Sequence, residues 1–273
     1  MSDDNVFNEM LDTELSGDFW SWFSNKDSSL KDHELLPGNQ ENSEISIDTQ
    51  INLNSGSVQF VRNNDKLHQT VFNYLEEELS NCSAFCLSVA FINFSGIQPL
   101  LPILRNLNQM GVPGKIITTD YLSFTEPKAL DYLSKFDNIE LKIFDSTRAK
   151  KGFHTKGYIF KNNDQSLHFI IGSSNLTQSA LHVNHEWNLL SIKKEPDQST
   201  RELLVEFYEL WISPYAVNYA EFIDSYRERY NLLKQEKLLL KNKTKSLVSN
   251  SDTQQEQMHP NEMQQRFINN LKQ

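Results

Sequence analysis

Residues 151–160 read KGFHTKGYIF, a short run that mixes aromatic and β-branched residues with polar ones. This pattern predicts a half-buried strand from Phe153 to Phe160. Side chains two positions apart on a strand point to the same face, so we expect His154 and Lys156 to lie side by side. A solvated strand edge can carry the same two residues, so the pair alone leaves packing and chemistry both open.

A second strand is expected after the polar turn KNNDQS, in LHFIIGSSN at 167–175. Two strands joined by an Asn- and Asp-rich connection predict a hairpin. The following LTQSAL has the composition of a helix start, with Ser173 or Ser174 as its cap. Such a turn aims backbone N–H groups, serine hydroxyls and the Asn175 amide at one point, where an anion can bind.

NHEWNLL at 184–190 places Glu186 at the entrance to a further strand. The hairpin is expected to bring the GSSN turn near His154 and Lys156. The sequence therefore assembles a histidine, a lysine, a Ser/Asn anion pocket and a carboxylate. These groups fit phosphodiester chemistry through a histidine nucleophile.

Together these residues resemble the signature of the phospholipase D superfamily, which is H-x-K, then an Asp, then G-S-x-N. Here it reads His154-x-Lys156 and Gly172-Ser173-x-Asn175. The surrounding sequence is similar to a narrower branch, the phospholipase-D-like (HKD) domain at the N-terminus of bacterial DEAD/DEAH-type (superfamily 2) helicases and in related restriction endonucleases. The segments that carry this similarity include LSVAFINFSGIQPLLPILRNL, GKIITTDYLSFTEPKALDYL and IELKIFD.

The resemblance covers residues 58–230 and implies an α/β, phospholipase-D-like sandwich with a mixed β-sheet flanked by helices. It implies that His154 attacks phosphorus and that Glu186 holds the imidazole in one tautomer. The residues implied to stabilise the phosphoryl oxygens are Lys156, Ser173 and Asn175. The family needs no metal, so we expect no cofactor.

Two features bear on activity. The motif Asp should fall at position 161, where this chain has Lys161; Asp164 lies nearby, in the predicted turn. The family also uses a second histidine as general acid on the leaving group. Because the chain has one motif, the resemblance implies a homodimer with the site on its two-fold axis.

The net charge of −10 is unevenly distributed. Residues 1–48 hold twelve acidic and two basic residues, whereas the rest of the chain carries 24 of each. Basic residues are concentrated at 142–161, which predicts a track for DNA phosphates, although a charge run is also typical of a solvated face. The residues expected to contact nucleic acid are Arg148, Lys150, Lys151 and Lys161.

Two segments are similar to motifs for other chemistries but do not match them. HVNHE at 182–186 does not have the H-E-x-x-H order of a zinc site, and GVPGK at 111–115 lacks the spacing of a phosphate loop. We expect the only cysteines, Cys82 and Cys86, to pack as small apolar groups. Low cysteine content and no apolar segment of about 18 residues predict a cytoplasmic protein without membrane contact.

Composition predicts four regions. They are an acidic, partly disordered segment at 1–57, the phospholipase-D-like domain at 58–230, a charged linker at 231–258 and the start of a possible helicase region at 259–273. The last region contains HPNEMQQ, which resembles the Pro-x-x-Met-Gln segment before the ATP-binding motif of superfamily 2 helicases. A helicase motor C-terminal to this chain is therefore expected; an amphipathic terminal helix is the alternative.

Three functions fit the sequence. The first is a metal-independent nuclease that acts on DNA through a histidine nucleophile. The second is a non-catalytic DNA-binding and dimerisation module of a helicase, which the missing motif Asp favours. The third is a phosphodiesterase acting on a lipid or another small substrate.

Overall fold

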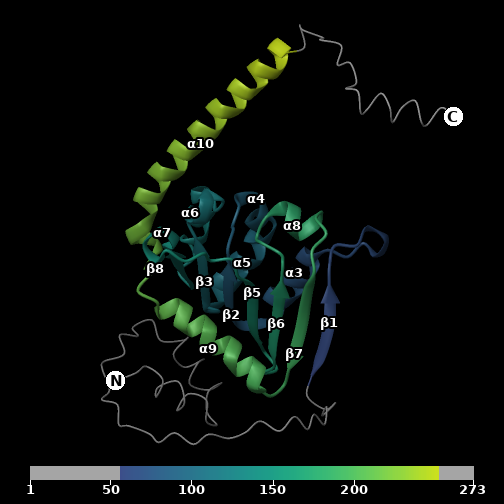
Figure 1. Ribbon diagram of the computed structural model, residues 1–273. Coiled ribbons are helices and arrows are strands. Elements are labelled where there is room, and N and C mark those ends of the chain that lie inside the picture. The colour runs from purple at the N-terminus through teal and green to yellow at the C-terminus, as the bar shows by residue number, and fades with distance from the viewer. Residues whose placement is uncertain (1–55, 252–273) are drawn as a thin grey trace, which may run out of the picture. The chain divides into compact units, whose positions relative to one another are not determined.

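The computed structural model describes residues 56–251 (Figure 1). Nearly all of the predicted acidic segment and the whole of the predicted helicase region lie outside the described residues, so both stay predictions. The compact unit that carries the sheet ends at Arg227.

Eight strands of the described chain form one mixed sheet in the order β1-β7-β6-β5-β2-β3-β4-β8 (Figure 1). β2, β3 and β4 run parallel, and every other neighbouring pair is antiparallel. This confirms the predicted α/β fold with a mixed sheet. The strands are β1 (Ser57–Val61), β2 (Cys82–Val89), β3 (Gly114–Thr119), β4 (Ile139–Phe144), β5 (Lys156–Asn162), β6 (Leu167–Gly172), β7 (Asn188–Lys193) and β8 (Ala216–Asn218).

Helices flank the sheet. The α-helices are α3 (Val71–Asn81), α4 (Phe94–Ile97), α5 (Leu101–Met110), α6 (Pro127–Leu133), α7 (Ser146–Ala149), α8 (Gln178–His182), α9 (Gln198–Ile212) and α10 (Tyr219–Ser251). Short 3-10 turns form η1 (Asp65–Leu67), η2 (Gln98–Leu100) and η3 (Tyr121–Ser123). In Figure 1, α9 crosses one face of the sheet, and α3 and α5 lie on the other.

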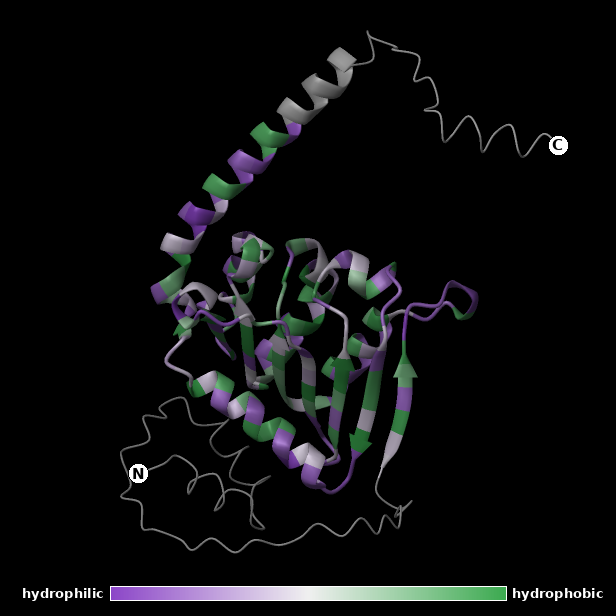
Figure 2. Ribbon diagram, in the orientation of Figure 1, coloured by the Kyte–Doolittle hydropathy of each residue, from purple (hydrophilic) through white to green (hydrophobic). Residues whose placement is uncertain are grey.

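The core has two layers because side chains alternate along each strand. On one face, Ile159 and Phe169 pack with Leu204, Phe207 and Trp211 of α9. Figure 2 shows the matching pattern, with hydrophobic residues concentrated on the strands and α9 alternating between hydrophobic and hydrophilic positions. The opposite face is covered partly by α3.

The start of α3 is set by local sequence. Thr70 accepts a hydrogen bond from the backbone N–H of Asn73, and the Asn73 side chain accepts one from the backbone N–H of Thr70. This reciprocal cap satisfies two donors that the first turn leaves unpaired. Val71, Leu75 and Leu79 then recur every four residues and are buried, so one stripe of the helix faces the sheet.

Both cysteines are free thiols in the core, as predicted. Burial raises the pKa of the Cys82 thiol to about 12, and burial also raises the pKa of Cys86 well above its usual value. Neither thiol therefore supplies a reactive thiolate at neutral pH.

The charged linker predicted at 231–258 stays a prediction, and its described part is helical. α10 continues to Ser251, so residues 231–251 are helical. Leu and Lys dominate this stretch, and these residues favour a helix even without a packed face. In the part of the chain that the structure describes, no helix has the length and apolarity to cross a membrane.

Candidate active site

The proposed catalytic residues lie at one edge of the sheet, where the parallel strands β2, β3 and β4 end. Val89 at the end of β2 pairs with Lys156 at the start of β5. Two strands further along, Gly172 at the end of β6 pairs with Asn188 at the start of β7. Sheet register thus brings the H-x-K segment, the GSSN turn and the Glu186 segment to the same edge.

His154 and Lys156 are in contact. The Nζ of Lys156 lies 2.9 Å from Nδ1 of His154 and donates a hydrogen bond to the His154 backbone oxygen at 2.9 Å. The prediction that both lie on one strand is wrong, because β5 begins at Lys156 and His154 precedes the strand. The imidazole is exposed and meets the Phe91 ring edge-on, with the ring centroids 5.7 Å apart.

Lys156 is buried, although a lysine side chain ordinarily carries a positive charge at neutral pH. Burial lowers the pKa of Lys156 because water no longer solvates the ammonium group, and the nearby charge of Glu186 partly opposes this. Burial also raises the pKa of Tyr158, with a smaller contribution from Glu186. The charge of Glu186 therefore influences the pKa values of two side chains near the start of β5, Lys156 and Tyr158.

Ser173 and Glu186 form a second contact. The Ser173 hydroxyl donates to the Glu186 carboxylate and accepts a hydrogen bond from the backbone N–H of Trp187 at 3.0 Å. The Ser173 backbone N–H donates to the Trp187 carbonyl at 3.1 Å. Among the described hydrogen bonds, none joins Glu186 to His154, so the carboxylate orients Ser173 here and not the imidazole as predicted.

The backbone of Phe91 holds the side chain of Asn175 in place. Its Oδ1 accepts a hydrogen bond from the backbone N–H of Phe91 at 3.1 Å, and the next residue, Leu176, bonds to the Phe91 carbonyl at 3.1 Å. The Asn175 side-chain oxygen is thus occupied by the backbone, and its Nδ2 is the group that can donate to an anion.

The neighbouring serine has a structural role. Ser174 is fully buried, and its hydroxyl accepts a hydrogen bond from Asn188 at 2.9 Å. The Tyr158 hydroxyl donates to the Ser174 carbonyl at 2.7 Å. The expectation that Ser173 or Ser174 caps the next helix is wrong, because Thr177 accepts the hydrogen bond at the start of α8.

Residues 76–211 match the family model described as "Cardiolipin synthase, PLD-like domain". The chain belongs to the phospholipase D superfamily. No curated protein matches it.

Solved structures with a similar fold include two bacterial proteins that are matched over nearly their whole length. NucT from Helicobacter pylori has 13% identity and a TM-score of 0.47, covering 60% of this chain and 99% of NucT. Nuc from Salmonella typhimurium, a phospholipase D family member, has 15% identity and a TM-score of 0.44, covering 60% of this chain and 98% of Nuc. Phosphatidylserine synthase from Haemophilus influenzae Rd KW20 has 18% identity and a TM-score of 0.44, covering 71% of this chain and 46% of the synthase.

The predicted phosphate track divides in two. Arg148, Lys150 and Lys151 are exposed and lie on or just after α7, a few residues before His154. Lys161 lies near the opposite end of β5 from Lys156. Five residues of strand span roughly 16 Å, so Lys161 lies far from Lys156 and apart from the other three basic residues.

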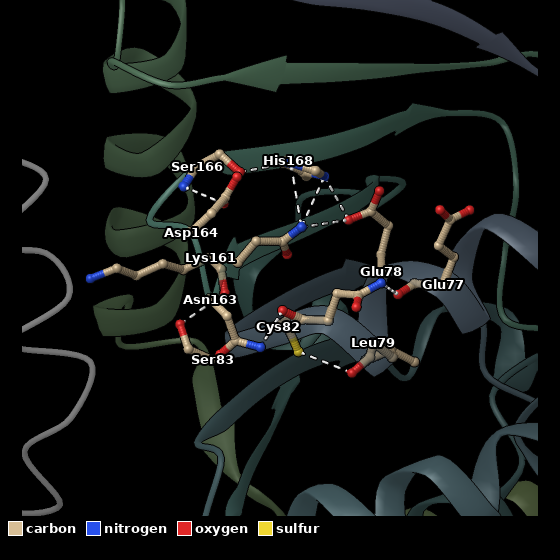
Figure 3. A network of polar contacts seen from close by, with 12 residues as sticks. Glu77, Glu78, Leu79, Cys82, Ser83, Lys161, Asn163, Asp164, Ser166 and His168 are labelled. Atoms are coloured by element: carbon tan, nitrogen blue, oxygen red, sulfur yellow. Dashed lines mark hydrogen bonds and ion pairs between the residues drawn. The ribbon is translucent and has the colours of Figure 1, made fainter.

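Position 161 is where the superfamily has its motif Asp, so that position also lies far from Lys156 along β5. That end of β5 lies beside a buried polar network (Figure 3). Nδ1 of His168 on β6 lies 2.8 Å from the carboxylate of Glu78 on α3, and Nε2 of His168 lies 2.9 Å from the Ser166 hydroxyl. The amide of Asn162 also reaches His168 at 3.2 Å. This network ties the tip of the β5–β6 hairpin to α3.

A cavity of about 290 Å³ opens beside the site on the α9 face. His154 and Lys156 are among its lining residues, and its apolar lining includes Ile159, Leu203 and Phe207. In the described chain, no cluster of three or more His, Cys, Asp or Glu residues is arranged to hold a metal ion.

Proposed function

We propose that the protein is a metal-independent phosphodiesterase that cleaves DNA through His154. The observation that carries the proposal is the contact between His154 and Lys156, at the same sheet edge as the Ser173–Glu186 pair. A nucleophilic nitrogen, a cation and hydroxyl and amide donors are the groups that phosphoryl transfer to histidine requires.

In the first step, a ring nitrogen of His154 attacks phosphorus. The N–P bond forms, the P–O bond to the leaving nucleoside breaks, and the leaving oxygen takes a proton from a second histidine. Water then attacks the phosphohistidine, the N–P bond breaks, and the water's proton returns to the second histidine. Bound phosphate would draw the Lys156 ammonium away from Nδ1 toward a phosphoryl oxygen.

Two further groups would act on the phosphoryl oxygens. The Nδ2 of Asn175 remains available as a donor because Phe91 already occupies Oδ1. Ser173 is exposed and is oriented by Glu186 and by the Trp187 backbone. Each well-placed donor of this kind supplies about 3 kcal/mol of transition-state stabilisation.

We propose that the second histidine comes from a second copy of the chain. A row of paired residues crosses the sheet face beside the site, in the order Gly157, Ile171, Leu189 and Phe60. The last three side chains are exposed, and the Trp187 ring, 74% exposed, packs edge-on against Phe60 at 6.1 Å. Contiguous exposed apolar residues next to a site that lacks one catalytic group fit a dimer interface.

Mixing wild-type protein with His154→Ala protein tests the shared site. If both histidines act on one phosphate, only wild-type pairs cleave, so activity after subunit exchange should fall with the square of the wild-type fraction. Trp187→Glu should shift sedimentation from dimer to monomer and reduce cleavage with it. Linear loss of activity on mixing, or a monomer that still cleaves, would overturn the dimer.

The pH dependence of cleavage tests the role of Lys156. Because the pKa of Lys156 is lowered, its ammonium group should lose its proton, and the site its positive charge, below the ordinary lysine pKa of about 10.4. Cleavage of single-stranded DNA should therefore decline on the alkaline side below that value. Lys156→Arg should lower the rate but remove this decline, since arginine stays charged.

The second histidine is another source of alkaline decline, because it no longer acts as general acid once it has lost its proton. Lys156 therefore accounts only for the part of the decline that Lys156→Arg removes. The raised pKa values of Tyr158 and of both cysteines keep those groups from titrating there. An unchanged decline in Lys156→Arg would assign it to another residue. Circular dichroism at each pH separates loss of charge from unfolding.

The apolar cavity beside His154 favours a second candidate, a phosphodiesterase that acts on a phospholipid. The family model that matches is described as that of a cardiolipin synthase, which accords with this reading. Release of phospholipid headgroups by the wild-type protein, without cleavage of DNA, would favour the lipid substrate. We retain the C-terminal helicase motor as a proposal, on the sequence of residues 259–273 alone.

A further inference from the structure

A short segment beside the site exposes three large apolar side chains. They belong to η3 and the residue after it: Tyr121, Leu122 and Phe124, which are 39%, 54% and 46% exposed. Leu122 and Ser123 both have positive φ values, 53° and 52°. Left-handed backbone is unfavourable for such residues and persists only where the surroundings enforce it.

Buried contacts on both sides hold the segment. Before it, the Asp120 carboxylate accepts hydrogen bonds from the backbone N–H and hydroxyl of Ser146 at 3.0 and 2.8 Å. After it, Thr125 is fully buried, its hydroxyl donates to the Ala90 carbonyl at 3.2 Å, and its own carbonyl accepts from Tyr226 at 2.6 Å. The apolar side chains are therefore presented from a fixed base.

The segment adjoins both the nucleophile and the basic residues. The ring of Phe124 meets that of Phe91 edge-on at 4.9 Å, and Phe91 meets His154 at 5.7 Å. The Asp120–Ser146 contact joins η3 to the start of α7, which carries Arg148 and is followed by Lys150 and Lys151. The aromatic segment thus adjoins both the nucleophile and the helix that carries Arg148, whose guanidinium donates to the Pro214 carbonyl.

We propose that this segment is a stacking platform for an unpaired base next to the phosphate held at His154. Single-stranded nucleic acid is bound by basic residues that follow the backbone and by aromatic rings on which bases stack. In a duplex the base faces are covered by their neighbours, so the platform selects single-stranded DNA. The proposal rests on the proposed function for its DNA substrate and adds the strand preference and its residues.

Binding by the full chain, in EDTA and in the His154→Ala background to prevent cleavage, tests this directly. Fluorescence anisotropy would compare a labelled thymidine oligonucleotide, an abasic oligonucleotide of equal length and a duplex. Phe124→Ala should weaken binding of the thymidine strand about tenfold. It should leave the abasic strand, which keeps the phosphates, unchanged.

Phe124→Trp should restore binding because it restores a ring. Met110→Ala is the matched control, since Met110 is also exposed but lies at the end of α5, away from this sheet edge. Thermal melting checks that each variant is folded. Equal affinity of Phe124→Ala and the parent protein for the thymidine strand, or equal losses on thymidine and abasic strands, would overturn the platform.

The outcomes separate the platform from the proposed function. Base-dependent binding through Phe124 without any cleavage by wild-type protein would keep the platform and refute the nuclease. Cleavage that depends on His154, with binding indifferent to bases, would refute the platform and keep the nuclease.

Discussion

Replacement of His154 by alanine should reduce DNA cleavage in EDTA by roughly 10⁴-fold or more, because it removes the nitrogen that bonds to phosphorus in the proposed mechanism. His154 is exposed, but its ring contacts the buried Lys156 ammonium and Phe91, so the substitution should lower the free energy of unfolding by about 1 kcal/mol. The measurement is cleavage of labelled single- and double-stranded DNA, with thermal melting of each protein.

His185→Ala is the matched control, because His185 is also exposed and makes none of the contacts that build the site. Its cleavage rate should stay near that of the wild-type protein. Cleavage that persists in His154→Ala would remove His154 from the mechanism. No cleavage by either protein, with DNA binding intact, would favour the non-catalytic DNA-binding module.

The largest effect on stability is expected in the network of Figure 3. His168→Leu should lower the free energy of unfolding by about 3 kcal/mol, because it leaves the carboxylate of Glu78 buried without its ring partner. The double variant Glu78→Leu/His168→Leu should recover part of that loss. Urea unfolding of the two single variants and the double variant gives the coupling energy.

Strictly additive losses in that cycle would show that Glu78 and His168 stabilise the fold independently. Cleavage by the folded fraction of His168→Leu should stay within a few-fold of wild type, because the network lies toward the opposite end of β5 from Lys156. A collapse of activity in the folded protein would instead connect this end of the hairpin to catalysis.

Motif spacing was sufficient to place His154 near Lys156, because only Thr155 separates them and positions two apart lie within about 7 Å in any conformation. It was not sufficient to define the strand. Alternation predicts a strand from Phe153. In the structure, the last residue of β2 that pairs with β5 is Val89, opposite Lys156. Beyond Val89 the chain leaves β5, and Ile92 pairs with Leu176 instead. The partner of a strand decides where the strand begins, and that partner is distant in sequence.

The contacts of individual side chains were less predictable. The sequence does not show that Glu186 bonds to Ser173, or that Phe91 packs against His154, because both depend on how separate segments meet in space. For Lys161, closeness in sequence wrongly suggested closeness in space. It is close to Lys156 in sequence, yet an extended strand carries it away from the site, and this distance also weakens the argument that the missing motif Asp abolishes catalysis.

The sheet order has a consequence for synthesis of the chain on the ribosome. Ser57 of β1 pairs with Ile192 of β7, and β7 is the only strand that β1 joins in the described sheet. At about 5–20 residues per second, β1 leaves the ribosome roughly 7–27 s before its partner exists. Until then its backbone donors and acceptors and its apolar side chains have no place in the sheet, so this period should be when the nascent protein depends most on chaperones.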